Sequence, residues 1–78
     1  MISSSQIRAG RSLLGWSALE LAEKSGVGVA SVRRYETQTG VPSANAKTLH
    51  ALRVAMENEG VEFLGDPLVN PGVMLRLK

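Results

Sequence analysis

Residues capable of covalent or metal chemistry are scarce in this chain. It contains one histidine, His50, and no cysteine. A catalytic site needs a nucleophile, a base and a group that orients the base, and a metal site needs several ligands at close spacing. Neither set can be assembled around a single histidine. The composition therefore predicts no catalytic residues, no metal site and no cofactor.

Two adjacent arginines, Arg33 and Arg34, have the most specific binding chemistry in the sequence. A guanidinium group donates two parallel hydrogen bonds to guanine O6 and N7, a contact worth about 1–3 kcal/mol of discrimination between bases. Adjacent arginines on a helix can equally form a solvated face without a ligand. The surrounding sequence has to decide between these two interpretations.

The composition is that of a small folded domain. The 78 residues are 44% hydrophobic and 21% charged, with a formal net charge of +2, which permits a nucleic-acid partner without requiring one. No apolar run approaches the ~20 residues that span a bilayer, and the first residues lack the apolar segment of a signal peptide. We therefore expect a cytoplasmic protein with no membrane segment.

Helix signals divide the first 60 residues into four segments. The serines at 3–5 can cap a first helix that ends at Gly15, and Ser17 with Glu20 forms a capping box for the second. The remaining signals predict an end of the second helix at Ser25–Gly26, a third helix over 29–36, and a fourth between its cap Ser43 and Gly60.

Small residues occur where the second and third helices would cross. In a helix-turn-helix the two helices meet at a steep angle over a turn of three or four residues. Ala22 is small enough for the crossing, and Gly26 adopts the positive φ of the turn without steric cost. Val32 then fills the wedge between the helices. The spacing predicts a helix-turn-helix over residues 18–37.

This segment resembles the Cro and phage-repressor-like family, also called the xenobiotic-response-element family. The resemblance covers about residues 5–60 and is carried by Leu21-Ala22, Gly26-Val27, Val32, Glu36, Arg11, Pro42-Ser43, Leu49 and Leu52. It implies an all-α, repressor-like bundle of four or five helices. It also implies sequence-specific binding to double-stranded DNA and transcription regulation, with the helix at about 29–36 in the major groove.

The resemblance also implies roles for individual residues. Arg34 falls at a base-contacting position, Arg33 lies nearer the DNA backbone, and Arg11 pairs with Glu36 to fasten the first helix to the third. The residues expected at the DNA are Ser17, Gly28, Val29, Ala30, Ser31, Arg33, Arg34 and Lys47. Among them the two serines and the lysine would reach phosphates, while the valine and alanine can touch a thymine methyl group.

Departures from the family pattern keep two other functions open. Ala18 stands where many relatives have a phosphate-binding glutamine, and the loop at 37–39 is neutral where the family loop is often basic. One alternative is a protein-interaction module that keeps the fold with weak or no DNA binding. The other is an antitoxin-type regulator whose tail binds a toxin or another effector protein.

Residues 61–78 are interpreted as a C-terminal extension that follows a DNA-binding domain at 1–60. Two short runs rich in β-formers, 61–64 and 73–77, flank a turn-rich loop and predict a short β-hairpin. An isolated hairpin is marginal in water, and its apolar residues are too many for the fourth helix alone to cover. We expect the last strand to pair with that of a second copy, giving a homodimer with recognition helices ~34 Å apart.

Overall fold

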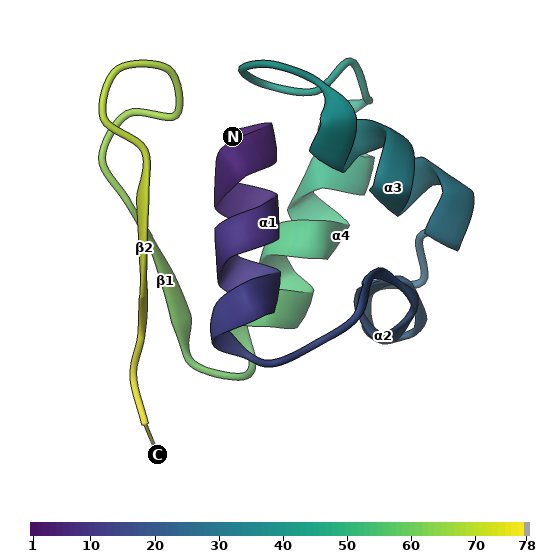
Figure 1. Cartoon of the computed structure of the whole chain (residues 1–78), viewed down its shortest axis with the longest axis horizontal. Coiled ribbons are helices and arrows are strands. Elements are labelled where there is room, and N and C mark those ends of the chain that lie inside the picture. Colours follow the sequence, from purple (N-terminus) through teal and green to yellow (C-terminus); the bar gives the residue numbers. More distant parts are fainter. Residues whose placement is uncertain (78) are drawn as a thin grey trace.

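The computed structural model describes residues 1–77, in which it contains four helices and one two-stranded sheet. The elements are α1 (Ser4–Leu13), α2 (Ala18–Ser25), α3 (Val29–Thr37), α4 (Ala46–Glu57), β1 (Val61–Leu64) and β2 (Gly72–Leu75). Figure 1 shows α1 and α4 in the middle, with the hairpin on one side of them and α2 and α3 on the other. The bundle in the described residues therefore has four helices, the lower of the two expected numbers.

Capping side chains define where the first two helices begin. The predicted capping box of α2 is present, because Ser17 Oγ accepts from Glu20 N at 3.1 Å and Glu20 Oε1 accepts from Ser17 N at 3.0 Å. Ser3 and Gln6 form a second capping box at the start of α1. Each box satisfies two N–H groups that a helix terminus leaves without intrahelical partners.

The start of α4 differs from the sequence-based prediction. Its N-cap is Asn45 rather than Ser43, and Asn45 Oδ1 accepts a hydrogen bond from Thr48 N at 2.7 Å. Ser43 lies in the preceding loop, where its N–H donates to Gln38 Oε1 at 2.7 Å. Asparagine and serine are about equally good caps, so the sequence alone does not choose between them. Helix α3 also runs one residue further than predicted, to Thr37.

The core lies between the helices and the hairpin, and burial of its apolar side chains is the main stabilising contribution. It is built from Ile2, Ile7, Leu21, Ala22, Val32, Tyr35, Leu49, Leu52, Ala55, Met56 and Val61. Trp16 is partly buried and packs against the edge of this core. Across residues 1–77, no helix combines the length and the apolar character needed to cross a membrane.

The hairpin turns one apolar face toward the bundle. Val61 lies opposite Leu75 and Phe63 opposite Val73 in an antiparallel register. These four side chains pack in or against the core, as expected when alternate residues of a strand share a face. Strand β2 begins one residue earlier and ends two residues earlier than predicted, and Leu77 beyond it is 89% exposed.

The hairpin docks on α1 as well as on α4, although the sequence suggested only the fourth helix. Gly10 of α1 is buried, and a Cβ atom there would lie 2.9 Å from Met56 Sδ. Gln6, also on α1, donates from Nε2 to Leu64 O at 3.2 Å and to Gly72 O at 3.0 Å. Helix α1 therefore holds the loop-facing ends of both strands.

Candidate nucleic-acid interface

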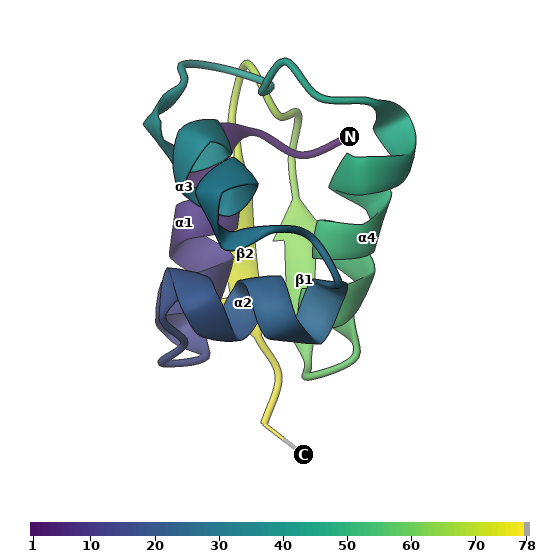
Figure 2. The same cartoon turned by 90° about the vertical axis from the view of Figure 1, so that its right-hand side faces the viewer.

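The turn between α2 and α3 has the predicted conformation. Gly26 has a φ of +75°, in the left-handed region that glycine adopts without steric cost. Ala22 and Val32 are 6% and 0% exposed where the two helices cross. Figure 2 shows α2 lying across the molecule below α3. The start of α3 stays accessible in this arrangement, since Gly28 and Ala30 are exposed.

One side of α3 is buried and the opposite side is open. Val32, Tyr35 and Glu36 face inward and are buried. The exposed residues are spaced i, i+3, i+4 and i+7, which places them on one face of a helix. We call this face the outer stripe: Ala30, Arg33, Arg34 and Thr37. Thr37 was missed from the sequence because it was assigned to the loop, but its helical spacing from Arg33 and Arg34 would have revealed it.

The Arg34 side chain is held in place without losing its binding capacity. Its guanidinium carbon lies 5.2 Å from the centroid of the Tyr35 ring, and its Nη2 donates to Ser31 Oγ at 3.4 Å. A guanidinium has five N–H donors, so this single long hydrogen bond leaves most of them for a ligand. Arg33 is exposed beside it.

Three side chains of α1 hold the C-terminal end of α3. Ser4 Oγ donates to Tyr35 O at 2.7 Å, and Arg8 Nη1 donates to Glu36 O. The Arg11 guanidinium forks onto the Glu36 carboxylate, with Nε–Oε2 and Nη2–Oε1 distances that are both 2.8 Å. We call Ser4, Arg8 and Arg11 the α1 clamp. Their i, i+4, i+7 spacing places all three on one face of α1, and together they fix the direction of α3.

The Arg11–Glu36 pair was predicted from the sequence, and its side chains are 24% and 9% exposed. The hydrogen bond to Glu36, helped by the charge of its carboxylate, raises the pKa of the Arg11 guanidinium above its usual value. A cation whose pKa rises on folding contributes stability below its unfolded-state pKa and loses it only at still higher pH. Arg11 therefore stays charged across the pH range of ordinary binding experiments.

The N-terminus of α2 is less open to phosphate than the sequence suggested. Free N–H groups and the helix dipole attract anions to such a terminus. Here the N–H of Ser17 already donates to Glu20, and both Glu20 and Glu23 are exposed. Their carboxylates repel a phosphate, so the hydroxyl proton of Ser17 is the donor that this residue still offers.

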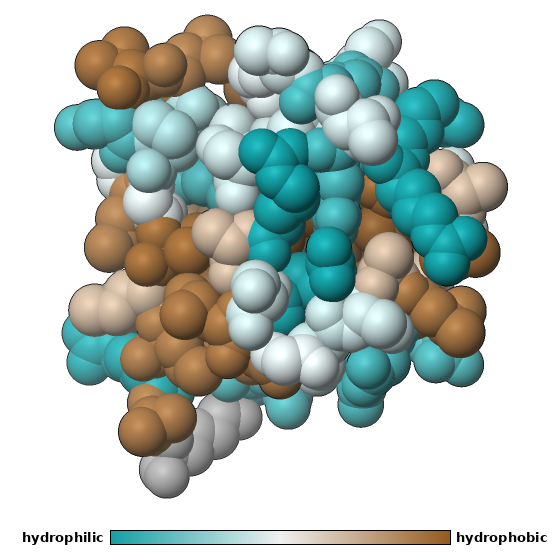
Figure 3. Space-filling view, viewed as in Figure 1, coloured by the Kyte–Doolittle hydropathy of each residue, from teal (hydrophilic) through white to brown (hydrophobic). Residues whose placement is uncertain are grey.

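Basic residues are concentrated in the helices rather than in the hairpin. Residues 1–60, which include all four helices, contain seven arginines and lysines and five acidic residues, whereas residues 61–78 contain two of each. Figure 3 shows apolar surface gathered on the hairpin side and polar surface over α1 and α3. The formal net charge of +2 therefore lies in the helical part of the chain.

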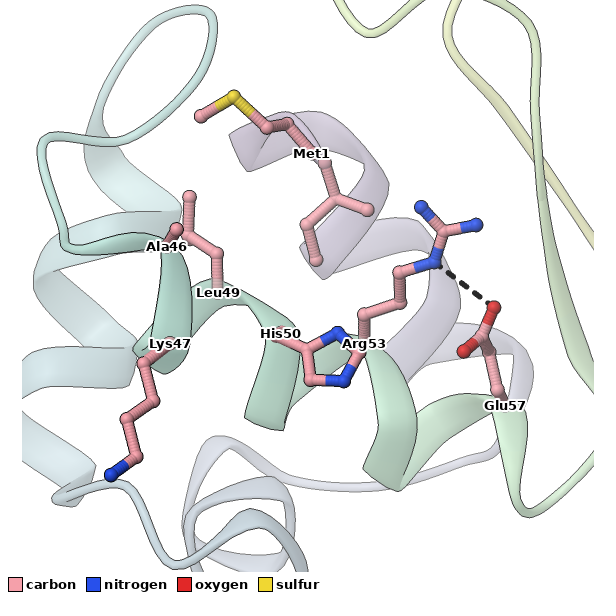
Figure 4. Close-up of a pocket in the computed structure, with 8 residues that line it drawn as sticks. Met1, Ala46, Lys47, Leu49, His50, Arg53 and Glu57 are labelled. Atoms are coloured by element: carbon pink, nitrogen blue, oxygen red, sulfur yellow. Dashed lines mark hydrogen bonds and ion pairs between the residues drawn. The ribbon is translucent and has the colours of Figure 1, made fainter.

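Lys47 is exposed at the start of α4 and also borders a groove. The groove has a volume of about 690 Å³ and is lined by Met1, Ile2, Ala46, Lys47, Leu49, His50, Arg53 and Glu57. In Figure 4 the Lys47 side chain points away from Met1, and Arg53 reaches Glu57, to which it donates at 3.0 Å. The groove therefore combines apolar walls with a partly cationic rim.

Six of the eight sequence-predicted residues lie in α3 or at its N-cap, and the other two lie at the starts of α2 and α4. Gly28, Val29, Ala30, Ser31, Arg33 and Arg34 follow one another from the N-cap of α3, Ser17 precedes α2, and Lys47 lies in the first turn of α4. Val29 is half-buried and packs against the core. The contacts of all eight residues with DNA stay predictions.

Comparison with known protein families supports the helix-turn-helix assignment made from the sequence. A helix-turn-helix family model matches residues 7–52, which is more than half of the chain and includes α2, the turn and α3 in full. A search among curated proteins gave no match. The left-handed turn at Gly26, the close crossing at Ala22 and the Arg11–Glu36 pair are features that the sequence predicted for a helix-turn-helix of this type. The chain belongs to the Cro and phage-repressor-like, or xenobiotic-response-element, family of helix-turn-helix DNA-binding domains.

Proposed function

We propose that this protein binds specific sequences in duplex DNA and regulates transcription, with α3 lying in the major groove. The outer stripe is the observation that supports this most directly. It puts one methyl group, Ala30, and two guanidinium groups, Arg33 and Arg34, on the open face of a single helix. The α1 clamp fixes the direction of that helix, so its contacts are made from a rigid element.

Phosphate contacts position a helix on DNA, and base contacts give specificity. Lys47 and the hydroxyl groups of Ser17 and Ser31 are our candidates for phosphate contacts, because Ser31 lies on α3 and the other two are exposed at the starts of α4 and α2. Arg34 is our candidate for a base contact, since it is exposed and already supported by the Tyr35 ring. Gly28 has no side chain at the exposed start of α3 and allows the DNA to approach closely.

Selection of bound duplexes from a random pool, followed by titration of variants, tests the proposal. We expect Arg34→Ala to cost about 1–3 kcal/mol on the selected site and to flatten the preference at one position. Lys47→Ala should weaken binding to selected and random DNA alike and lower the salt slope by about 1. Arg76→Ala, in the hairpin, is the control and should change neither. Equal losses on both DNAs for Arg34→Ala would remove its base-reading role, and a pool without bound sequences would refute the function.

We infer further that two copies pair through β2 and bind a nearly palindromic site. In the described residues β2 has a neighbour on one edge only, and an unpaired edge is a template for another strand. Two β2 strands joined antiparallel form one continuous sheet about a twofold axis perpendicular to that sheet. Since the hairpin and α3 lie on opposite sides of α1, this axis runs toward α3 (Figure 1). Both copies of α3 then face the same duplex.

Sedimentation of the full chain at tens of micromolar tests the dimer. In a pair centred on Met74, which is 41% exposed, the two Met74 side chains lie opposite each other. Met74→Lys places like charges there, which is destabilising, and should give a monomer. Leu13→Lys alters an apolar residue of similar exposure, 44%, on α1 and should leave the dimer intact. A monomeric wild-type chain would exclude this assembly.

A second candidate function is binding of a protein partner with weak or no DNA binding. It is favoured by the groove beside α4 and by the carboxylates of Glu20 and Glu23 on α2. An antitoxin-type regulator would combine both functions, with DNA on α3 and a toxin or effector protein held elsewhere. A gel shift with random duplex at low salt separates the candidates, because nonspecific DNA binding is strongest under that condition. No shift would favour the protein-interaction module.

A further inference from the structure

We propose that α3 reads methyl groups in the major groove, so that affinity depends on the C5-methyl group of thymine and responds equally to 5-methylcytosine. This inference rests on the proposed DNA binding and specifies what the outer stripe recognises. It concerns the first turn of α3, where Ala30 is exposed and Gly28 carries no side chain.

The outer stripe offers few kinds of contact to base edges. Residues 29–37 contain no asparagine or glutamine, the side chains that pair with adenine. Their single carboxylate, on Glu36, is buried and bonded to Arg11, so it cannot accept from cytosine N4. Thr37 Oγ1 already donates to Arg34 O at 2.8 Å, and Ser31 Oγ accepts from Arg34 Nη2 at 3.4 Å while its hydroxyl proton is our candidate for a phosphate contact. Guanine, through an arginine, and a methyl group are the partners that remain.

The start of α3 offers a small apolar surface to the major groove of the DNA. A Cβ atom built on Gly28 would meet nothing within 4 Å, so the space beside Ala30 is open to a base edge. Val29 packs against the core and extends the apolar surface behind it. A methyl group pressed against this surface loses contact with water, which is favourable. Cytosine lacks this methyl group, and its N4 donor, which 5-methylcytosine also carries, finds no side-chain acceptor on this surface.

The helical spacing relates the methyl contact to the guanine contact. Ala30 precedes Arg33 and Arg34 by three and four residues, or about 4.5–6 Å along the helix axis at 1.5 Å per residue. Successive nucleotides of one strand are about 3.4 Å apart along the duplex. For a helix lying along the groove, the two contacts therefore fall one or two base steps apart. The preferred half-site contains a thymine within two steps of a guanine.

Base analogues in the selected duplex test this inference one atom group at a time. Each thymine is replaced in turn by deoxyuridine, which lacks only the methyl group. We expect one position per half-site to weaken binding about fourfold, which corresponds to about 0.8 kcal/mol for one methyl-sized contact. At that position 5-methylcytosine should bind better than cytosine by a similar factor.

Variants assign the methyl contact to a residue. Ala30→Gly removes the methyl group that would contact the base. The loss of affinity caused by deoxyuridine, which we call the uracil effect, should therefore disappear in this variant. The effect of 7-deazaguanine, which lacks the N7 acceptor of guanine, should persist. Ala46→Gly makes the same change at the start of α4 and is the matched control, in which the uracil effect should remain.

The possible outcomes separate this inference from the function on which it rests. If no duplex is bound, DNA binding fails and methyl reading fails with it. If a duplex is bound but every uracil is tolerated, DNA binding stands and methyl reading is overturned. If the uracil effect survives in Ala30→Gly, its assignment to Ala30 is overturned.

Discussion

The two sides of α1 are fastened by different kinds of interaction. Toward α3 it directs Ser4, Arg8 and Arg11, whose hydrogen bonds end on two carbonyl oxygens and one carboxylate. Toward the hairpin it presents the bare surface of Gly10, packed by apolar side chains, and the amide of Gln6. Hydrogen bonds depend on direction, whereas apolar burial does not. The polar side therefore controls orientation, and the apolar side mainly covers the core.

Among the substitutions that test this comparison, those that break the Arg11–Glu36 pair should have the largest effect on stability. Arg11→Met or Glu36→Gln leaves a partly buried charge without its partner, and we expect a loss of about 2–3 kcal/mol in the free energy of unfolding. Urea denaturation of both single variants and the double variant measures the coupling. DNA affinity should fall as well, since α3 loses its fixed direction. Additive effects of the two substitutions would mean that the pair does not couple the helices.

On the other side of α1, Gln6→Met keeps the shape of the side chain but removes its hydrogen bonds to Leu64 and Gly72, together with the bond that Gln6 Oε1 accepts from Ser3 N in the capping box. Losing hydrogen bonds at these partly buried groups costs about 1–2 kcal/mol, so the free energy of unfolding should fall by that amount. DNA affinity should stay unchanged, because the clamp is intact. Ser12→Ala, at an exposed position of α1, serves as the control. A drop in DNA affinity equal to that from Glu36→Gln would contradict the division between the two sides.

A smaller effect is expected at the start of α2, which lies near the DNA in the proposed complex. Glu20→Gln retains the capping box, since glutamine also serves at that position, but removes a negative charge. Charge near a helix terminus is worth about 0.3–1 kcal/mol, so DNA affinity at low salt should rise about two- to fivefold. Glu59→Gln, an equal charge change near the hairpin, should have little effect. The prediction fails if the two variants bind DNA equally well.

The smallest effect should come from the outer face of the hairpin. Arg76 pairs with Glu62 there, and their side chains are 70% and 37% exposed. Exposed pairs contribute about 0–1 kcal/mol, so Arg76→Gln should change the urea midpoint only slightly. A loss as large as that from Gln6→Met would show that this face of the hairpin contributes more to stability than its exposure suggests.

The two sides of α1 also differ in how far the sequence predicts them. Ala22, Gly26 and Val32 are close together in the chain, and their sizes alone predict the turn and the crossing. Gln6 has partners 58 and 66 residues away. Because both are backbone carbonyls, which every residue carries, nothing in the sequence marks them. The hairpin itself was predictable from its β-formers, but its position on α1 was not.

Similar reasons explain the other differences between the sequence-based predictions and the structure. Ser4 and Arg8 were not predicted as clamp residues because they also bond to backbone carbonyls, whereas Arg11 meets a carboxylate that identifies its partner. Ser43 and Asn45 are two acceptable caps two residues apart, and the fold selects Asn45. The residues expected at the DNA were predictable as a group because they follow from the position of α3. Their contacts depend on a partner that is not part of the chain.

The attachment of α3 has a consequence for how this protein can diversify. Two of the three clamp residues bond to the carbonyl oxygens of Tyr35 and Glu36, which survive any side-chain replacement. The outer stripe lies on the opposite face and takes no part in the core. Its four positions can therefore mutate together while the scaffold is retained. The preferred DNA sequence can then change almost independently of folding stability. A library randomised at these positions should yield folded members with new DNA preferences.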